Sequence, residues 1–218
     1  KENEDLEAFI LEHVPTLSEG AILVVTSKIV ALAEGRTGAL EDREKIIADE
    51  SEFVLQTKYT WLTIKDGTIM ANAGVDESNA DGKLVLLPKD SFASAEVLRA
   101  KLLRHFGLKN LGILITDSRL LPLRAGVVGV ALGYAGFKGI RDYRGTQDIF
   151  GRELKLSRTD VADSLATAAV VEMGEGNEQR PLCIIEGAPV EFVENVDRRE
   201  LHIDIADDVY RPLFDRLN

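Results

Sequence analysis

Two kinds of apolar pattern follow one another along this chain. Runs of apolar and β-branched residues predict strands, and such runs occupy residues 21–26, 60–64, 68–71, 83–87, 111–115 and 182–185. Apolar residues at helical spacing predict amphipathic helices, and this spacing occurs over residues 5–13, 41–56, 94–106, 158–173 and 209–217, with a turn or short helix at 27–33.

Turn residues refine this pattern. Asp66-Gly67 lies between two strand-like runs and predicts a β-hairpin, and the glycine-rich residues 126–136 predict close backbone approach or bulges. Because strands and helices mix without a regular βαβ repeat, we predict an α+β fold with mixed sheets, packed helices and two closely joined subdomains. Residues 1–218 would form a single domain. Since the chain opens on KENEDLEAF without Met, we expect a leading strand to be missing from it.

Composition limits the classes of molecule that this chain is expected to bind. The formal net charge is −11 and no block of Lys and Arg stands out, so a nucleic acid is an unexpected partner. No apolar stretch approaches the ~20 residues of a membrane span, and we expect no signal peptide from the residues at the start. The single cysteine, Cys183, lies in an apolar run, which favours a buried thiol over a nucleophile and is compatible with the cytoplasm.

The first candidate motif is AGVDESN, residues 73–79. Asp76 and Asn79 are three residues apart, so both can face one ligand from a single turn. A carboxylate suits a hard cation such as Mg²⁺ or Mn²⁺, and an amide suits a base edge, sugar or phosphate. The alternative is an Asx turn that closes a hairpin.

The second motif is ITDS, in which Asp117 and Ser118 follow an apolar strand. Their carboxylate and hydroxyl oxygens can ligate a cation, and the alternative is a cap on a following turn. Two carboxylates at separate strand ends can hold a divalent metal against nucleotide phosphates. A nucleotide is not indicated by the common fingerprints, because the chain has neither GxxxxGK[ST] nor GxGxxG.

Three further segments are candidates. Residues 26–36 (TSKIVALAEGR) offer a hydroxyl and an ammonium after a strand, which suits phosphate, with a solvated loop as the alternative. Residues 142–154 (DYRGTQDIFGREL) are either a substrate loop or a hairpin with surface ion pairs. Residues 173–179 (MGEGNEQ) form a loop after a helix. None of the three histidines has ligand spacing with another.

The order of these segments resembles that of the coenzyme F-420 gamma-glutamyl ligase family over residues 21–187, namely TSKIVALAEGR, AGVDESN, LVLLPKD, ILITDS, LRAGVVGVALGYAG, DYRG-x-x-D-x-FGREL, VADSLATAA and MGEG. The resemblance implies an intertwined α+β homodimer in the cytoplasm. It implies GTP (or ATP) as co-substrate and Mg²⁺ or Mn²⁺ as cofactor, with K⁺ as a further candidate ion. The reaction it implies joins L-glutamate to the terminal carboxylate of a phospholactyl-deazaflavin precursor through an acyl phosphate.

The resemblance also implies roles for single residues. The metal ligands would be Asp76, Asp117 and Ser118. The catalytic candidates are Arg124, which would grip a carboxylate, and Asp148 of the DYRG segment. Nucleotide binding would fall to Ser27, Asn79, Met173, Gly174, Glu175 and Gly176, with Lys28 in place of a family lysine where this chain has Leu32.

The chain departs from the family pattern after the second motif. The family reads Gly-Arg, an aromatic and Arg, whereas here Leu-Leu-Pro-Leu (120–123) precedes Arg124, and the late strand ends in Glu186-Gly187 instead of Arg-Gly. We therefore expect a less anionic acceptor, with tetrahydrofolate and its extended glutamate tail as a candidate beside the deazaflavin precursor. The alternatives are a non-catalytic nucleotide- or cofactor-binding relative and a metal-dependent phosphohydrolase.

Overall fold

The computed structural model describes residues 2–214 and is an α+β fold, as predicted. Its helices are α1 (Leu6–His13), α2 (Ser27–Ala33), α3 (Arg43–Asp49), α4 (Ser91–Phe106), α5 (Val161–Met173) and α6 (Arg211–Phe214), with short 3-10 turns η1 (Leu40–Asp42), η2 (Asn72–Gly74) and η3 (Ile205–Asp207). Its strands are β1 (Ile22–Thr26), β2 (Thr37–Gly38), β3 (Phe53–Gln56), β4 (Trp61–Lys65), β5 (Thr68–Ala71), β6 (Leu84–Val85), β7 (Gly112–Leu120), β8 (Val127–Ala135), β9 (Ile140–Asp142), β10 (Arg158–Asp160) and β11 (Leu182–Ile185).

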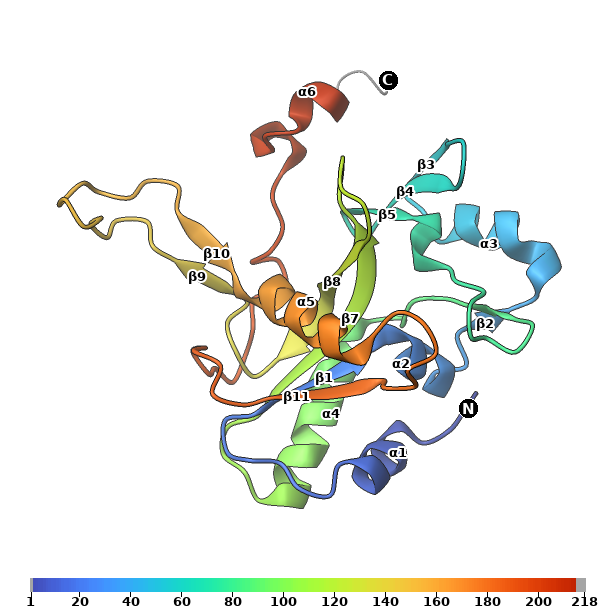
Figure 1. Ribbon diagram of the computed structural model, residues 1–218, viewed down its shortest axis with the longest axis horizontal. Helices are drawn as coiled ribbons and strands as arrows, with labels where there is room; N and C mark the ends of the chain where they lie inside the picture. Colours follow the sequence, from blue (N-terminus) through green and yellow to red (C-terminus); the bar gives the residue numbers. More distant parts are fainter. Residues whose placement is uncertain (1, 215–218) are drawn as a thin grey trace.

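A four-stranded sheet of order β11-β1-β7-β8 forms the centre of the molecule (Figure 1). Only β1 and β7 pair in parallel. Helix α4, with α1 beside it, packs on one face and α5 packs on the other. Burial on both faces explains why β1 and the first half of β7 are continuous apolar runs. Alternate residues supply the two cores, with Leu23, Val25, Ile113 and Ile115 on the α4 side and Ile22, Val24, Leu114 and Tyr134 on the α5 side.

A second, smaller core lies beside this sheet. It is built around Ile47 of α3, Leu84 of β6 and Trp61 of the antiparallel sheet β3-β4-β5. The predicted hairpin is present, because β4 and β5 pair across Asp66 and Gly67, both at positive φ. Over the described residues, no helix combines the length and apolar character that crossing a membrane requires.

Two predicted helices include residues that form strands instead. Helix α3 ends at Asp49, and Phe53–Gln56 instead form β3 on β4, because cross-strand pairing outweighs the helical spacing of the run. Arg158–Asp160 form β10 on β9, so α5 begins only at Val161. Helix α6 begins at Arg211 instead of residue 209, and the predicted part beyond residue 214 lies outside the described residues.

The segment at 142–154 belongs to a β-hairpin, which is one of the two interpretations that the sequence left open. We call the hairpin from β9 to β10 the arm. β9 and β10 pair antiparallel, and the loop between them projects away from the central sheet (Figure 1). The arm exposes Ile149, Phe150 and Leu156, each more than four-fifths accessible. Apolar side chains this exposed are typical of a surface that another molecule covers.

The start of α5 gives a pH-dependence prediction. Burial, and then the charges of Asp163 and Glu200, raise the pKa of the helix cap Asp160 to about 6. Because this pKa is raised, the contribution of Asp160 to the unfolding free energy is complete below the pKa of the unfolded chain, about 4. This contribution is lost as the pH rises through about 6. Asp160→Asn keeps the cap but stays neutral. The carboxylate is partly exposed and solvent screens it. We therefore expect the unfolding free energy of Asp160→Asn, relative to that of the wild type, to increase by on the order of 1 kcal/mol between pH 4.5 and pH 7.5. Urea unfolding at the two pH values measures this, and an equal difference at both would contradict it.

Candidate active site

The site begins where β1 ends beside β7. These parallel strands pair as far as Thr26 and Thr116. Ser27, the first residue of α2, follows Thr26, and Asp117 follows Thr116. The Ser27 hydroxyl donates to Asp117 Oδ1 at 3.2 Å. The carboxyl end of parallel strands is where α/β folds collect functional groups.

The expectation that Asp117 lies at a strand end needs correction. Strand β7 continues to Leu120 because β8 pairs with it beyond the point where β1 stops. The β7–β8 register shifts between Ile115 and Thr116, directly before Asp117. The extra residue is Leu132 of β8, because Ile115 pairs with Gly133 and Thr116 pairs with Ala131. Bulges are frequent beside active sites. Asp117 therefore lies at the end of the parallel pair, inside a longer antiparallel one.

Asp76 comes to the same place from the second core. It follows η2, in which Ala73 has a left-handed backbone (φ 53°), and it bridges Val85 through two backbone hydrogen bonds. Asp76 Oδ1 accepts from the Ser78 N–H at 2.9 Å, so the Asx turn is present. Its Oδ2 accepts from Lys28 Nζ and the Ser78 hydroxyl, both at 2.6 Å. The turn fixes the carboxylate while leaving it in contact with a cation.

The loop after α5 closes the third side. Glu175 accepts a hydrogen bond from the Ser118 hydroxyl. The Asn79 amide donates to the Gly176 carbonyl at 3.2 Å. Segments that are nearly a hundred residues apart in the chain thus meet in one hydrogen-bonded cluster. We call it the central cluster, consisting of Ser27, Lys28, Asp76, Ser78, Asn79, Asp117, Ser118, Glu175 and Gly176.

The two aspartates of the central cluster differ electrostatically. Burial raises the pKa of Asp117 above its ordinary value, and the charge of Asp76 adds to this, against hydrogen bonds from Ser118 and Ser27 and the charge of Arg119. Burial also acts on Asp76, but hydrogen bonds from Lys28 and Ser78 outweigh it and lower the pKa. Asp117 is therefore the carboxylate that most lacks a compensating cation.

A divalent cation fits this chemistry. Asp76 and Asp117 are close enough for their charges to interact, and the donors around them are oxygens, which suit Mg²⁺ or Mn²⁺. The Lys28 ammonium already occupies a cationic position on Asp76. Within residues 2–214, no three His, Cys, Asp or Glu side chains gather closely enough to hold a metal alone. A metal here would need further oxygens, such as those of a phosphate.

Arg119 is a site residue that the motif analysis missed. It lies two residues after Asp117 on β7, so both side chains are on the same face of the strand. The guanidinium is largely buried and interacts with the charges of Asp117 and Asp163. Its Nε has no hydrogen-bond partner among residues 2–214. The alternation of side chains along a strand, which places residues 117 and 119 on the same face, is the sequence signal that could have indicated Arg119.

Arg119 gives a stability prediction. Arg119→Met keeps most of the side-chain volume but leaves Asp117 and Asp163 without their shared cation. We expect a loss of roughly 2 kcal/mol in unfolding free energy, and Arg119→Lys should recover part of it. Denaturant unfolding at pH 7 measures both. A Met variant as stable as the wild type would show that the guanidinium does not compensate these carboxylates.

Other predicted residues lie outside the central cluster. Arg124 is in the exposed turn between β7 and β8, with its N–H bonded to Leu121. Asp148 is on the exposed arm, where its Oδ1 accepts from the N–H groups of Phe150 and Arg152. The Met173 side chain is buried in the α5-side core, so only its backbone faces the loop. Among the described residues, neither Arg124 nor Asp148 has a hydrogen bond or an ion pair with the central cluster.

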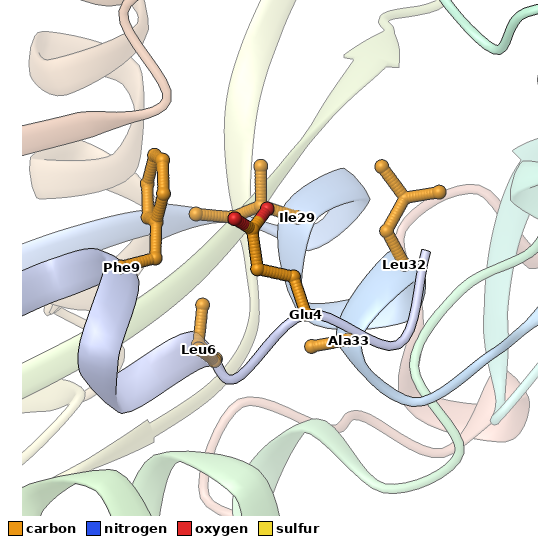
Figure 2. A pocket seen from close by; sticks show the side chains of 6 residues that line it. All are labelled: Glu4, Leu6, Phe9, Ile29, Leu32 and Ala33. Carbon is orange, nitrogen blue, oxygen red and sulfur yellow. The ribbon is translucent and has the colours of Figure 1, made fainter. Parts of the chain in front are cut away.

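Leu32 lies where the family pattern has lysine. It packs against Ala31, Ala80 and Val85. Figure 2 shows it at the rim of a small pocket between α1 and α2, which Glu4, Leu6, Phe9, Ile29 and Ala33 also line. Lys28 precedes Leu32 by one helical turn on the same face, and it is the ammonium that contacts Asp76.

Comparison with known proteins agrees with these motifs. The family model described as F420-0:Gamma-glutamyl ligase matches residues 1–187. A protein named Coenzyme F420:L-glutamate ligase from Archaeoglobus fulgidus is 36% identical over 211 residues, covering 87% of this chain and 84% of that protein. The protein of the same name from Methanocaldococcus jannaschii is 36% identical over 208 residues, covering 93% and 83%. One from Methanococcus maripaludis is 40% identical over 169 residues, covering 77% and 67%.

The family match therefore covers the strands, helices and loops that build the central cluster. Ser27, Lys28, Asp76, Asn79, Asp117, Ser118 and the loop at 173–176 all lie inside the matched residues. The chain belongs to the F420-0:gamma-glutamyl ligase family, whose members are amide-bond-forming ligases.

Proposed function

We propose that this protein is a nucleotide- and divalent-metal-dependent gamma-glutamyl ligase that joins L-glutamate to the terminal carboxylate of an F420-type acceptor. The observation that carries the proposal is the central cluster, in which Lys28, Asp76 and Asp117 meet from three separate segments. An ammonium beside two carboxylates suits a triphosphate accompanied by a metal ion. The relatives' names supply the glutamate and the F420-type acceptor.

Each part of the cluster has a role in this proposal. Mg²⁺ or Mn²⁺ held by Asp76, Asp117 and Ser118 would offset the repulsion between triphosphate and acceptor carboxylate. Lys28 and Ser27, at the start of α2, would hold phosphate oxygens. Asn79 and the loop at 173–176 would hold the rest of the nucleotide, GTP or ATP, because their hydrogen bond joins two sides of the cluster.

The reaction then has two steps. An oxygen of the acceptor carboxylate attacks the γ-phosphorus, the nucleoside diphosphate leaves, and an acyl phosphate forms. The amine nitrogen of glutamate attacks the acyl carbon, phosphate leaves, and the nitrogen loses a proton as the amide forms. The chain's contribution is to hold the reactants in line and to exclude water from the acyl phosphate.

The acceptor could be a deazaflavin precursor or tetrahydrofolate. The relatives favour the first. The second rests on Leu120, Leu121 and Leu123, which replace the family's arginine and aromatic residue and are exposed after Asp117. An apolar turn at this position suits an acceptor with less negative charge near its reacting end.

A homodimer is part of the proposal. The arm projects from the protomer and exposes Ile149, Phe150 and Leu156. Burying three such side chains would contribute several kcal/mol, which a second copy of the chain can provide. Sedimentation at micromolar concentration should give twice the 23.9 kDa mass of one chain, and a monomer would contradict the proposal.

One assay separates the candidate functions. The protein is incubated with GTP or ATP, Mg²⁺ or Mn²⁺, glutamate and each acceptor, and the products are weighed by mass spectrometry. A ligase releases phosphate only when glutamate and acceptor are both present, and its product is heavier by one glutamyl residue. Phosphate release without glutamate would indicate a phosphohydrolase. Binding without turnover would indicate a non-catalytic relative.

A further inference from the structure

A cleft of about 610 Å³ lies at the base of the arm, away from the central cluster. It is formed by β9, β10, the first residue of α5 and the segments around residues 138, 190 and 200. Its volume is in the range of small-molecule sites. Its basic and imidazole side chains are Lys138, Arg141, Arg144, Arg158, Arg199 and His202.

The lining has an excess of positive charge in a chain of net charge −11. Five cationic side chains face three acidic ones, Asp142, Glu191 and Glu200. Two cations are neutralised within the cleft, because Lys138 pairs with Glu191 at 2.6 Å and Arg144 pairs with Asp142. Glu200 accepts from the Tyr134 hydroxyl and the Gly139 N–H, both at 2.6 Å, and so belongs to the wall.

Three guanidinium groups remain without a carboxylate bonded to them. Among the described residues, the Arg141 side chain donates only to the Pro189 carbonyl. The side chains of Arg158 and Arg199 make no hydrogen bond or ion pair with any part of the chain between residues 2 and 214, although Arg158 lies near enough to Asp142 to contribute to lowering its pKa, after the hydrogen bonds from Arg144. Guanidinium groups bind phosphate and carboxylate oxygens in a two-point geometry. The cleft thus has donors for several oxyanions.

The cleft and the loop that brings Glu175 and Gly176 into the central cluster lie at opposite ends of α5. Val161, the first residue of the helix, lines the cleft. Glu175 and Gly176, just beyond its last residue, belong to the central cluster. A helix of 13 residues spans about 20 Å, so the loop at Glu175 and Gly176 is far from the cleft. Asp117 lies nearer to it, because Arg119 interacts with the charges of both Asp117 and Asp163 in the first turn of α5.

We propose that this cleft is a second binding site, for a small molecule that carries at least two phosphate or carboxylate groups. Its apolar lining is limited to Ile140, Val161 and Val190, so the site recognises charge rather than a flat ring. The same chemistry could come from a polyphosphate or from an oligoglutamate. The test therefore uses one probe of each kind.

The experiment is titration calorimetry on the full chain in low salt and EDTA, with inorganic pyrophosphate and with tri-γ-glutamate as probes. Without metal, Asp76 and Asp117 repel anions at the central cluster, so binding reports the cleft. We expect binding of at least one probe that weakens with added salt. The double variant Arg158→Gln/Arg199→Gln should bind it at least tenfold more weakly. The control Arg152→Gln removes the same type of charge from the arm outside the cleft and should bind as the wild type does.

Lys28→Gln provides the second control, because it changes the central cluster and leaves the cleft intact. Unchanged probe binding in this variant supports a separate site, whereas its loss would place the anion at the central cluster and overturn the proposal. Absence of binding for both probes would overturn it too, as would equal weakening by Arg152→Gln. None of these outcomes depends on ligase turnover, so the two proposals can fail independently.

Discussion

Asp117→Asn is expected to abolish ligase turnover while leaving the protein at least as stable as the wild type. Asparagine has nearly the same shape, so the bond from Ser27 to its side-chain oxygen can persist. Burial raises the pKa of Asp117, which means that the ionised form is less favourable in the folded protein than in the unfolded chain. A neutral side chain removes that cost. It also removes the negative charge with which the proposed site would hold a metal ion.

We expect the turnover number to fall by about 100-fold or more and the melting temperature to stay equal or rise. Asp76→Asn should lower turnover similarly. Its pKa is lowered by the bonds from Lys28 and Ser78, and those bonds weaken in the neutral variant, so it should cost stability instead. The opposite signs in stability, together with a shared loss of turnover, distinguish a functional carboxylate pair from a structural one.

The control is Asp81→Asn, in the same loop as Asp76. Its backbone has φ 49°, a conformation that asparagine tolerates, and its side chain is exposed. Turnover and melting temperature should match the wild type. Full activity in both Asp76→Asn and Asp117→Asn would remove the metal assignment, whatever the melting temperatures show.

Gly133→Ala is expected to cost about 3 kcal/mol of unfolding free energy. A Cβ at this position in β8 would lie 2.5 Å from the Phe92 nitrogen and 2.5 Å from the Ser91 carbonyl carbon. Both atoms belong to the backbone at the start of α4, so no side-chain rotation relieves the overlap. Helix α4 would have to move off the sheet, and the α4-side core would lose packing.

Thermal and urea unfolding measure this effect. Gly129→Ala tests the other face of the same strand, because its Cβ would lie 2.4 Å from the Ala166 carbonyl oxygen in α5. Gly126→Ala is the graded control, since nothing lies within 4 Å and only its positive φ of 87° is strained, at a cost of about 1 kcal/mol. If Gly133→Ala cost no more than Gly126→Ala, close helix approach would not be the reason for glycine in β8.

The glycine-rich run shows what pattern reading can and cannot provide. Its composition predicted close backbone approach or a bulge, and both are present in β8. The pattern did not show that the run is a single nine-residue strand, with α4 against Gly133 and α5 against Gly129. Those contacts join residues more than 30 positions apart, and no local spacing encodes them.

The errors have the same origin. Phe53 and Val54 lie at helical spacing with Ile46 and Ile47, yet pairing with β4 makes them a strand. Arg158–Asp160 look continuous with α5, yet pairing with β9 ends the helix there. In both cases local propensity, worth a few tenths of a kcal/mol per residue, is outweighed by partners supplied from elsewhere in the chain.

By itself, the sequence determined the fold class, most of the elements and the two acidic motifs, because these depend on short-range periodicity and on residue chemistry. Only the tertiary structure decided that Lys28, Asp76 and Asp117 meet, and that the half-buried Arg119 lies beside Asp117. It also decided that Arg141, Arg144, Arg158 and Arg199 line one cleft. The physical reason is that charge interactions depend on distance and burial, and both are set by the packing of segments that are far apart in the chain.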